Sequence, residues 1–175
     1  MEKLRLATVW LDGCAGCHMS LLDIDEGILS VAALADLVYS PLVDTPEFPE
    51  GVDVTLVEGA VASQEDADKL QLIRDRTHIL VALGDCAVTG NVPALRNSIP
   101  VSQLMQRLYV DRSQIADTAP HDGVPTLLPQ ARPLHEWVRV DFHLPGCPPA
   151  PQAILAVLSD LLERRKPRPV VLKFG

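Results

Sequence analysis

Four cysteines are the residues of this chain whose type and spacing could do chemistry: Cys14, Cys17, Cys86 and Cys147. Thiolates are soft ligands that suit iron–sulfur clusters or zinc. Structural zinc sites usually take their ligands from two closely spaced pairs, whereas only the first pair is close in this sequence. The spacing therefore favours an iron–sulfur cluster and leaves a zinc-stabilised interaction protein as an alternative.

The residues next to the cysteines also favour an iron–sulfur cluster. Glycines flank all four: Gly13, Gly16, Gly84 and Gly146. Glycine-rich turns can aim backbone N–H groups at an anionic group such as the sulfurs of a cluster. Taken alone, Cys14-Ala-Gly-Cys17 would also suit a thioredoxin-type redox pair, and the two later cysteines could be small buried hydrophobic residues.

Strands are predicted immediately before the cysteine loops. Residues 5–11, 78–83 and 137–142 read as strands that precede Cys14 and Cys17, Cys86 and Cys147, respectively, and residues 53–57 form a further strand that ends at Glu58. In open α/β sheets, the loops at the carboxyl ends of strands converge on one site. We therefore expect the four thiols to meet at one edge of a parallel sheet.

Helices are predicted between these strands. Apolar residues at spacings of three and four indicate one helix over residues 20–38, capped by Ser20. The other expected elements are a loop at 41–50, a helix opening with Ser63-Gln-Glu-Asp66, a short helix at 101–109, a long loop at 111–134, a last helix through Ile154 and Leu162, and an extended piece at 170–172. The alternation predicts an α/β fold, an open parallel sheet with helices on both faces. The proline-rich loop at 111–134 is a candidate partner interface.

Composition limits the function classes. The 175 residues predict one domain, 1–175, and 47% hydrophobic residues suffice for a core. The net charge of −8 argues against a nucleic-acid surface. We expect no signal peptide and no membrane span, hence a cytoplasmic location, where cysteines are more often metal ligands or redox groups than disulfides.

Four motifs resemble the small subunits of [NiFe] hydrogenases. They are Val9-Trp-Leu-Asp-Gly-Cys-Ala-Gly-Cys-His-Met-Ser-Leu-Leu22, Val57-Glu-Gly-Ala-Val61, Gly84-Asp-Cys-Ala-Val-Thr-Gly90 and Leu144-Pro-Gly-Cys-Pro-Pro-Ala-Pro151. They occur in the family's order and cover residues 9–151. The Cys-His-Met-Ser version and the short length are most similar to the soluble, NAD(P)-coupled members.

The resemblance implies a flavodoxin-like fold and a role in electron transfer. Cys14, Cys17, Cys86 and Cys147 would bind one proximal [4Fe-4S] cluster, and the Ni-Fe site would belong to a hydrogenase large subunit. Flavin- and Fe–S-containing diaphorase subunits, which reduce NAD(P), would be further partners, and FMN is a further candidate cofactor. Glu58 would lie near the cluster at the subunit interface, on a proton path; read locally, it is a solvated strand-end carboxylate or a helix cap.

The sequence also departs from parts of the family pattern. Many members carry a C-terminal domain with two more clusters, whereas this sequence has no cysteine beyond Cys147, so we expect at most one cluster. Complex I-like quinone oxidoreductases have two adjacent cysteines in the first motif, which this chain lacks. A flavin-binding electron-transfer module is another alternative. His18 reads locally as a partly exposed loop histidine, with tuning of the cluster or proton relay as the functional reading.

Overall fold

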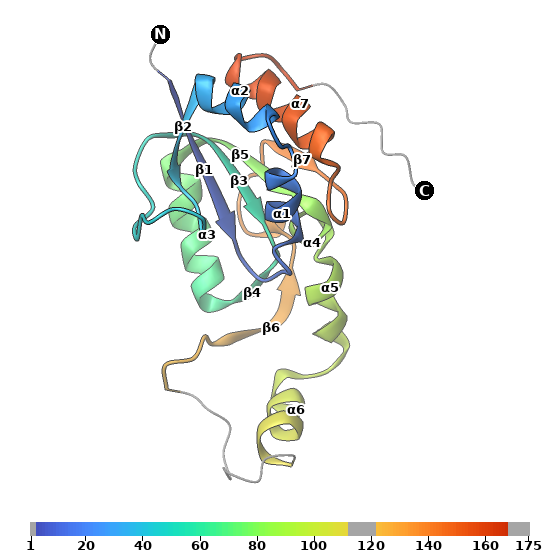
Figure 1. Cartoon of the computed structure of the whole chain (residues 1–175). Helices are drawn as coiled ribbons and strands as arrows, with labels where there is room; N and C mark the ends of the chain where they lie inside the picture. Colours follow the sequence, from blue (N-terminus) through green and yellow to red (C-terminus); the bar gives the residue numbers. More distant parts are fainter. Residues whose placement is uncertain (1–2, 112–121, 168–175) are drawn as a thin grey trace.

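The computed structural model describes residues 3–111 and 122–167, and its centre is a parallel sheet (Figure 1). The five strands are β1 (Leu4–Trp10), β2 (Ala35–Tyr39), β3 (Val52–Glu58), β5 (Thr77–Leu83) and β7 (Phe142–Leu144). They pair in the order β2-β1-β3-β5-β7, every pair parallel. Counted along the chain within this sheet, that order is 2-1-3-4-5, the order of flavodoxin-like folds, whose switch point lies between β1 and β3.

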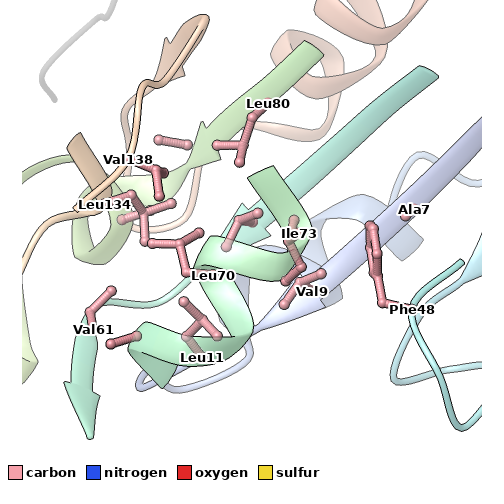
Figure 2. Packing of buried hydrophobic residues seen from close by; sticks show 14 of the residues in the cluster. Ala7, Val9, Leu11, Phe48, Val61, Leu70, Ile73, Leu80, Leu134 and Val138 are labelled. Atoms are coloured by element: carbon pink, nitrogen blue, oxygen red, sulfur yellow. The ribbon is translucent and has the colours of Figure 1, made fainter. Parts of the chain in front are cut away.

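Helices cover both faces of the sheet (Figure 1). On one face α3 (Gln64–Arg76) buries Leu70 and Ile73 against Val9 and Leu80, as Figure 2 shows. On the other face lie α1 (Gly16–Leu22), α2 (Gly27–Leu34) and α7 (Pro151–Leu162). The strands are apolar on both sides because successive side chains point to opposite faces and both faces are covered. The predicted fold class is confirmed.

The predicted opening of α3 is confirmed in detail. Ser63 is the N-cap, and its side chain accepts a hydrogen bond from the backbone N–H of Asp66. The Asp66 carboxylate in turn accepts from the N–H of Ser63 at 3.0 Å. This reciprocal capping box satisfies two N–H groups that the helix itself leaves unpaired.

The single helix predicted over residues 20–38 is wrong. The chain forms α1 and α2 with a turn between them, in which Asp25 adopts a positive φ of 53°, and then the edge strand β2. A spacing of four from Leu34 to Val38 continues a helical pattern, but β2 gains a ladder of hydrogen bonds with β1. Ser20 does not cap the helix: it lies inside α1, and its hydroxyl donates to the Pro149 carbonyl at 2.5 Å.

The strand predicted at 137–142 is displaced along the chain. A short 3-10 turn, η3 (Leu134–Glu136), precedes it, and only Phe142–Leu144 pairs with β5 as β7. Val138 and Val140 instead pack against the core without joining the ladder. Their alternation reflects burial, which the sequence pattern cannot distinguish from strand pairing.

Part of the predicted 111–134 loop is also a strand. β6 (Leu127–Arg132) pairs antiparallel with β4 (Val61–Ser63), outside the main sheet. Before it come α4 (Gly84–Thr89), α5 (Asn91–Ala94), η1 (Leu95–Ser98), α6 (Val101–Met105) and the π-helical turn η2 (Gln106–Val110). The last two correspond to the predicted helix at 101–109. Residues 112–121 and 170–172 lie outside the described residues. Within the described ranges, no helix has the length and hydropathy to span a membrane.

Asp141 ties α3 to the sheet near β7. Its Oδ2 accepts from Arg74 Nη1 at 2.6 Å and from the Leu80 backbone N–H at 2.9 Å. Burial opposes ionisation of this carboxyl, but the Leu80 and Arg74 hydrogen bonds and the charges of Arg74 and Arg139 outweigh it. They hold the pKa of Asp141 below its ordinary value.

We expect Asp141→Asn to lower the free energy of unfolding by about 1 kcal/mol at pH 7, the usual scale for a partly exposed ion pair. A lowered folded-state pKa stabilises the fold above the unfolded pKa, and this stability is lost as the pH falls through the folded pKa. Urea unfolding from pH 7 to pH 3 should therefore show the difference from wild type shrinking below about pH 4. Asp68→Asn, an exposed change on α3, is the control; a difference that does not depend on pH would contradict the account.

Candidate metal centre

The four cysteines all lie at the carboxyl edge of the sheet. Cys14 is in the loop after β1, Cys17 in the first turn of α1, Cys86 in α4 directly after β5, and Cys147 in the loop after β7. This edge contains the β1/β3 switch point, where ligands bind in open α/β sheets. The loops converge as the strand pattern predicts.

The thiols lie close enough to influence one another. The Cys17 thiol feels the charges of Cys14 and Cys86, and the Cys86 thiol feels those of Cys14 and Cys147. Gly84 begins α4 with a φ of +83°, and a Cβ at this position would overlap the sulfur of Cys17. The Cys17 and Cys86 loops are thus in direct contact, and only glycine permits this approach.

Asp85 fastens the Cys86 loop to the Cys147 loop. Its carboxylate accepts from the Gly146 backbone N–H at 2.7 Å, and its own N–H donates to the Gly146 carbonyl at 2.9 Å. Ser20 adds a second tie, from α1 to Pro149. Three chain segments that are distant in sequence are therefore held together by the chain's own hydrogen bonds.

Glu58 lies beneath the first cysteine loop. It ends β3, is 2% exposed, and accepts from the His18 backbone N–H at 3.1 Å. His18 stands at the third position of α1, so Glu58 caps this helix from another element. Of the two local readings the helix cap is confirmed, and a solvated carboxylate is wrong. The role of Glu58 at an interface or on a proton path stays a prediction.

His18 is not a partly exposed loop residue; that interpretation is wrong. The residue is 4% exposed, and its Nδ1 lies 2.9 Å from Glu58 Oε1 without forming a hydrogen bond to it. Nε2 lies 2.9 Å from the Thr8 hydroxyl, which is 2.8 Å from that of Ser40. The Glu58 carboxylate therefore lies next to a series of buried polar groups, His18, Thr8 and Ser40, that reaches the end of β2.

The electrostatics of the site disfavour free thiolates. Burial is the main reason that the pKa of Cys17 is raised, followed by the charge of Glu58 and a hydrogen bond with it, and then by the neighbouring thiols. Burial also raises the pKa of Cys86, against a lowering hydrogen bond from the Val92 backbone N–H. Deprotonating Cys17 and Cys86 therefore calls for a cationic group beside them, since metal binding is what displaces thiol protons in such sites.

Donors to the sulfurs come from one further segment. The Asn91 side-chain Nδ2 donates to Cys147 Sγ at 3.5 Å, and the Val92 N–H bonds the sulfur of Cys86. Sequence reasoning missed Asn91, Asp85 and Thr8. The only signal for Asn91 was its place directly after the predicted Gly84–Gly90 motif.

The donor set fits a cluster better than a single ion. Among the described residues, which include all four cysteines, no three His, Cys, Asp or Glu side chains approach closely enough to hold one metal ion. A zinc ion would require all its thiolates within about 2.3 Å of one point, whereas a four-iron cluster takes one cysteine on each iron and accepts wider spacing. Four cysteines that come from separate loops are therefore suited to an iron–sulfur cluster.

Comparison with known families gives one match over most of the chain. The family model described as NADH ubiquinone oxidoreductase, 20 Kd subunit, matches residues 14–161. This range includes all four cysteines and Glu58.

Individual relatives are hydrogenase subunits. The chain is 37% identical to the delta subunit of the NAD-reducing hydrogenase HoxS of Cupriavidus necator, covering 93% of this chain and 80% of that one. It is 34% identical to a subunit of the F420-non-reducing hydrogenase vhu of Methanocaldococcus jannaschii, covering 94% of this chain but only 58% of the relative. The chain thus spans little more than half the length of the second relative.

A solved structure is similar over the full length. A chain in the crystal structure of an NAD+-reducing [NiFe]-hydrogenase in the H2-reduced state superposes with a TM-score of 0.93 at 40% identity, covering 99% of this chain and 100% of that one. The likeness therefore extends over the whole fold.

Proposed function

We propose that this chain, which belongs to the NADH ubiquinone oxidoreductase 20 Kd subunit family and within it to the [NiFe] hydrogenase small subunits, transfers electrons as the small subunit of an NAD-reducing hydrogenase. The observation that carries the proposal is the placement of four cysteines from three loops at the carboxyl edge of the sheet. The likeness to an NAD-reducing hydrogenase chain over its whole length supports the NAD coupling.

The proposed cofactor is one [4Fe-4S] cluster held by Cys14, Cys17, Cys86 and Cys147, within a single domain spanning residues 1–175. When bound, such a cluster accepts and releases one electron at a time. The chain's own residues hold its place: Asp85 joins two ligand loops, Glu58 caps the helix that carries Cys17, and the Val92 N–H supplies positive potential at Cys86.

The chemistry of hydrogen would lie in a partner. The proposed partners are a hydrogenase large subunit with the Ni-Fe site and flavin- and Fe–S-containing diaphorase subunits that reduce NAD(P), in a cytoplasmic complex. Large apolar side chains around the cysteine loops are exposed, as expected of a surface that a permanent partner covers: Trp10, Met19, Leu22, Val92 and Leu95. In this proposal Glu58 contributes to proton movement near that interface.

A flavin-binding electron-transfer module is a second candidate, because the strand order is that of flavodoxin. In flavodoxin, FMN binds at the switch point that here holds Cys14 and Cys17. Cluster and flavin would therefore compete for one place in this chain, and four converging thiols favour the cluster. FMN elsewhere in the complex stays part of the proposal.

A complex I-like quinone oxidoreductase subunit is the remaining alternative, since the family model bears the name of such a subunit. The sequence holds no pair of adjacent cysteines, and the relatives at 34–37% identity are hydrogenase subunits. Both observations favour the hydrogenase.

The test is metal analysis and electron paramagnetic resonance on protein purified without air, together with whatever copurifies. We expect about four iron and four sulfide per chain, with a cubane-type signal on reduction. We also expect nickel in a copurifying subunit, and reduction of NAD(P) with hydrogen by the copurified complex. One zinc per chain, or a bound flavin without iron, would contradict the proposal.

A further inference from the structure

Asn91 stands where its side chain meets one of the ligand sulfurs. Gly90 ends α4 with a φ of +87°, and Asn91 itself has a positive φ of 30°. Positive φ is rare outside glycine, although asparagine tolerates it better than most residues. This backbone conformation brings Nδ2 of Asn91 to 3.5 Å from Sγ of Cys147, although the two residues are 56 positions apart in the chain.

The side-chain donor of Asn91 lies next to a backbone donor from Val92. Val92 gives its backbone N–H to the sulfur of Cys86, a bond that any residue at this position would make. The bond to Cys147 comes from a side chain, so the residue type decides whether it exists. Cys147 is exposed and Cys86 only half-buried, and the two donors together cover the side of the site that these cysteines form.

Hydrogen bonds to ligand sulfurs favour the reduced state of a cluster. Reduction adds negative charge that is shared with the thiolates, and an N–H directed at a sulfur stabilises this extra charge. Removing such a donor lowers the reduction potential without removing a ligand. Asn91 is such a donor to the sulfur of Cys147. Neither the four ligands nor Glu58 fills this role.

We propose that Asn91 is a positioning residue for electron transfer, whose side-chain amide raises the reduction potential of the cluster through its hydrogen bond to Cys147. The inference rests on the proposed function, because it requires a cluster on the four cysteines. Asn91 does not bind iron, and it acts on the cluster only through the sulfur.

The test is Asn91→Gly in the complex as purified without air, followed by a redox titration of the cluster monitored by electron paramagnetic resonance. Glycine removes the amide and adopts the positive φ without strain. At the midpoint potential of the wild type, we expect the ratio of reduced to oxidised cluster to fall roughly three- to tenfold, the range for the net effect of one hydrogen bond. Iron content should stay at the wild-type level.

Two further variants sharpen the test. Asn91→Asp keeps the shape but replaces the donor by a carboxylate, so the ratio should fall further than in Asn91→Gly. Ser98→Ala changes an exposed side chain in the segment that follows Asn91, leaves the Val92 backbone N–H in place, and should match the wild type. An unchanged ratio in Asn91→Gly, or loss of iron from both Asn91 variants, would overturn the inference. Wild-type protein without iron would instead overturn the proposed function.

Discussion

Protein carrying Cys86→Ala is expected to lose its cluster, with iron and sulfide falling well below the about four per chain of a complete [4Fe-4S] group. The competing interpretation is that Cys86 is a small hydrophobic residue and not a ligand. A half-buried cysteine can fill that role. Alanine satisfies that role at little cost. As a ligand, however, the sulfur cannot be replaced by a methyl group.

The measurement is iron and sulfide per chain, with the spectrum of the reduced protein, after purification without air. The same loss is expected for Cys14→Ala, Cys17→Ala and Cys147→Ala, because each thiol holds a separate iron in such a cluster. Leu29→Ala is the control, since it removes an exposed apolar side chain from α2 and not from a cysteine loop. Retention of full iron in Cys86→Ala would remove that residue from the ligand set.

The convergence of the cysteines could be predicted from the sequence because it depends on few features. Strands such as 78–83 are continuous apolar runs, and parallel strands place their carboxyl ends at one edge whatever the details of the helices. Glu58 could be placed at the same edge for the same reason. Errors in the first helix and in the strand before Cys147 left the site intact, since they moved the element boundaries but not the loops.

The contacts around the cysteines could not be predicted in this way. Asp85 meets Gly146 across 61 positions and Asn91 meets Cys147 across 56, and no local period encodes such pairs. The sequence predicts a partly exposed loop position for His18 because it directly follows Cys17 in the glycine-rich turn. Its burial follows from contacts with Thr8 on β1 and Glu58 on β3, the two strands at the switch point.

Strand β2 shows the limit of periodicity most clearly. Its residues continue the spacing of the preceding helix, so the sequence pattern favours one long helix over residues 20–38. The edge of the sheet offers β1 as a partner, and the hydrogen-bonded ladder outweighs the local pattern. Without β2 the strand order would lack the position that makes β1 and β3 the switch point.

Gly84→Ala is expected to destroy the metal site while leaving most of the fold in place. Two costs add at this position. An L-residue at a φ of +83° is strained by about 1–2 kcal/mol, and the new Cβ would overlap the sulfur of Cys17. A free thiol could rotate away from the methyl group, but a sulfur fixed on iron cannot. We therefore expect iron per chain to fall far below the wild-type level, by the same analysis as for the cysteine variants.

Gly123→Ala separates the two costs. Gly123 has a comparable φ of +73°, but a Cβ there would meet nothing within 4 Å. This variant should lose about 1–2 kcal/mol of unfolding free energy from backbone strain and keep its iron. If Gly84→Ala behaves in the same way, with stability lowered and iron retained, then the Cys17 sulfur is free to move, and it is not a ligand. Loss of iron in Gly84→Ala alone would show that the Cys17 sulfur must stay where Gly84 allows it, which is the behaviour of a ligand fixed between two loops.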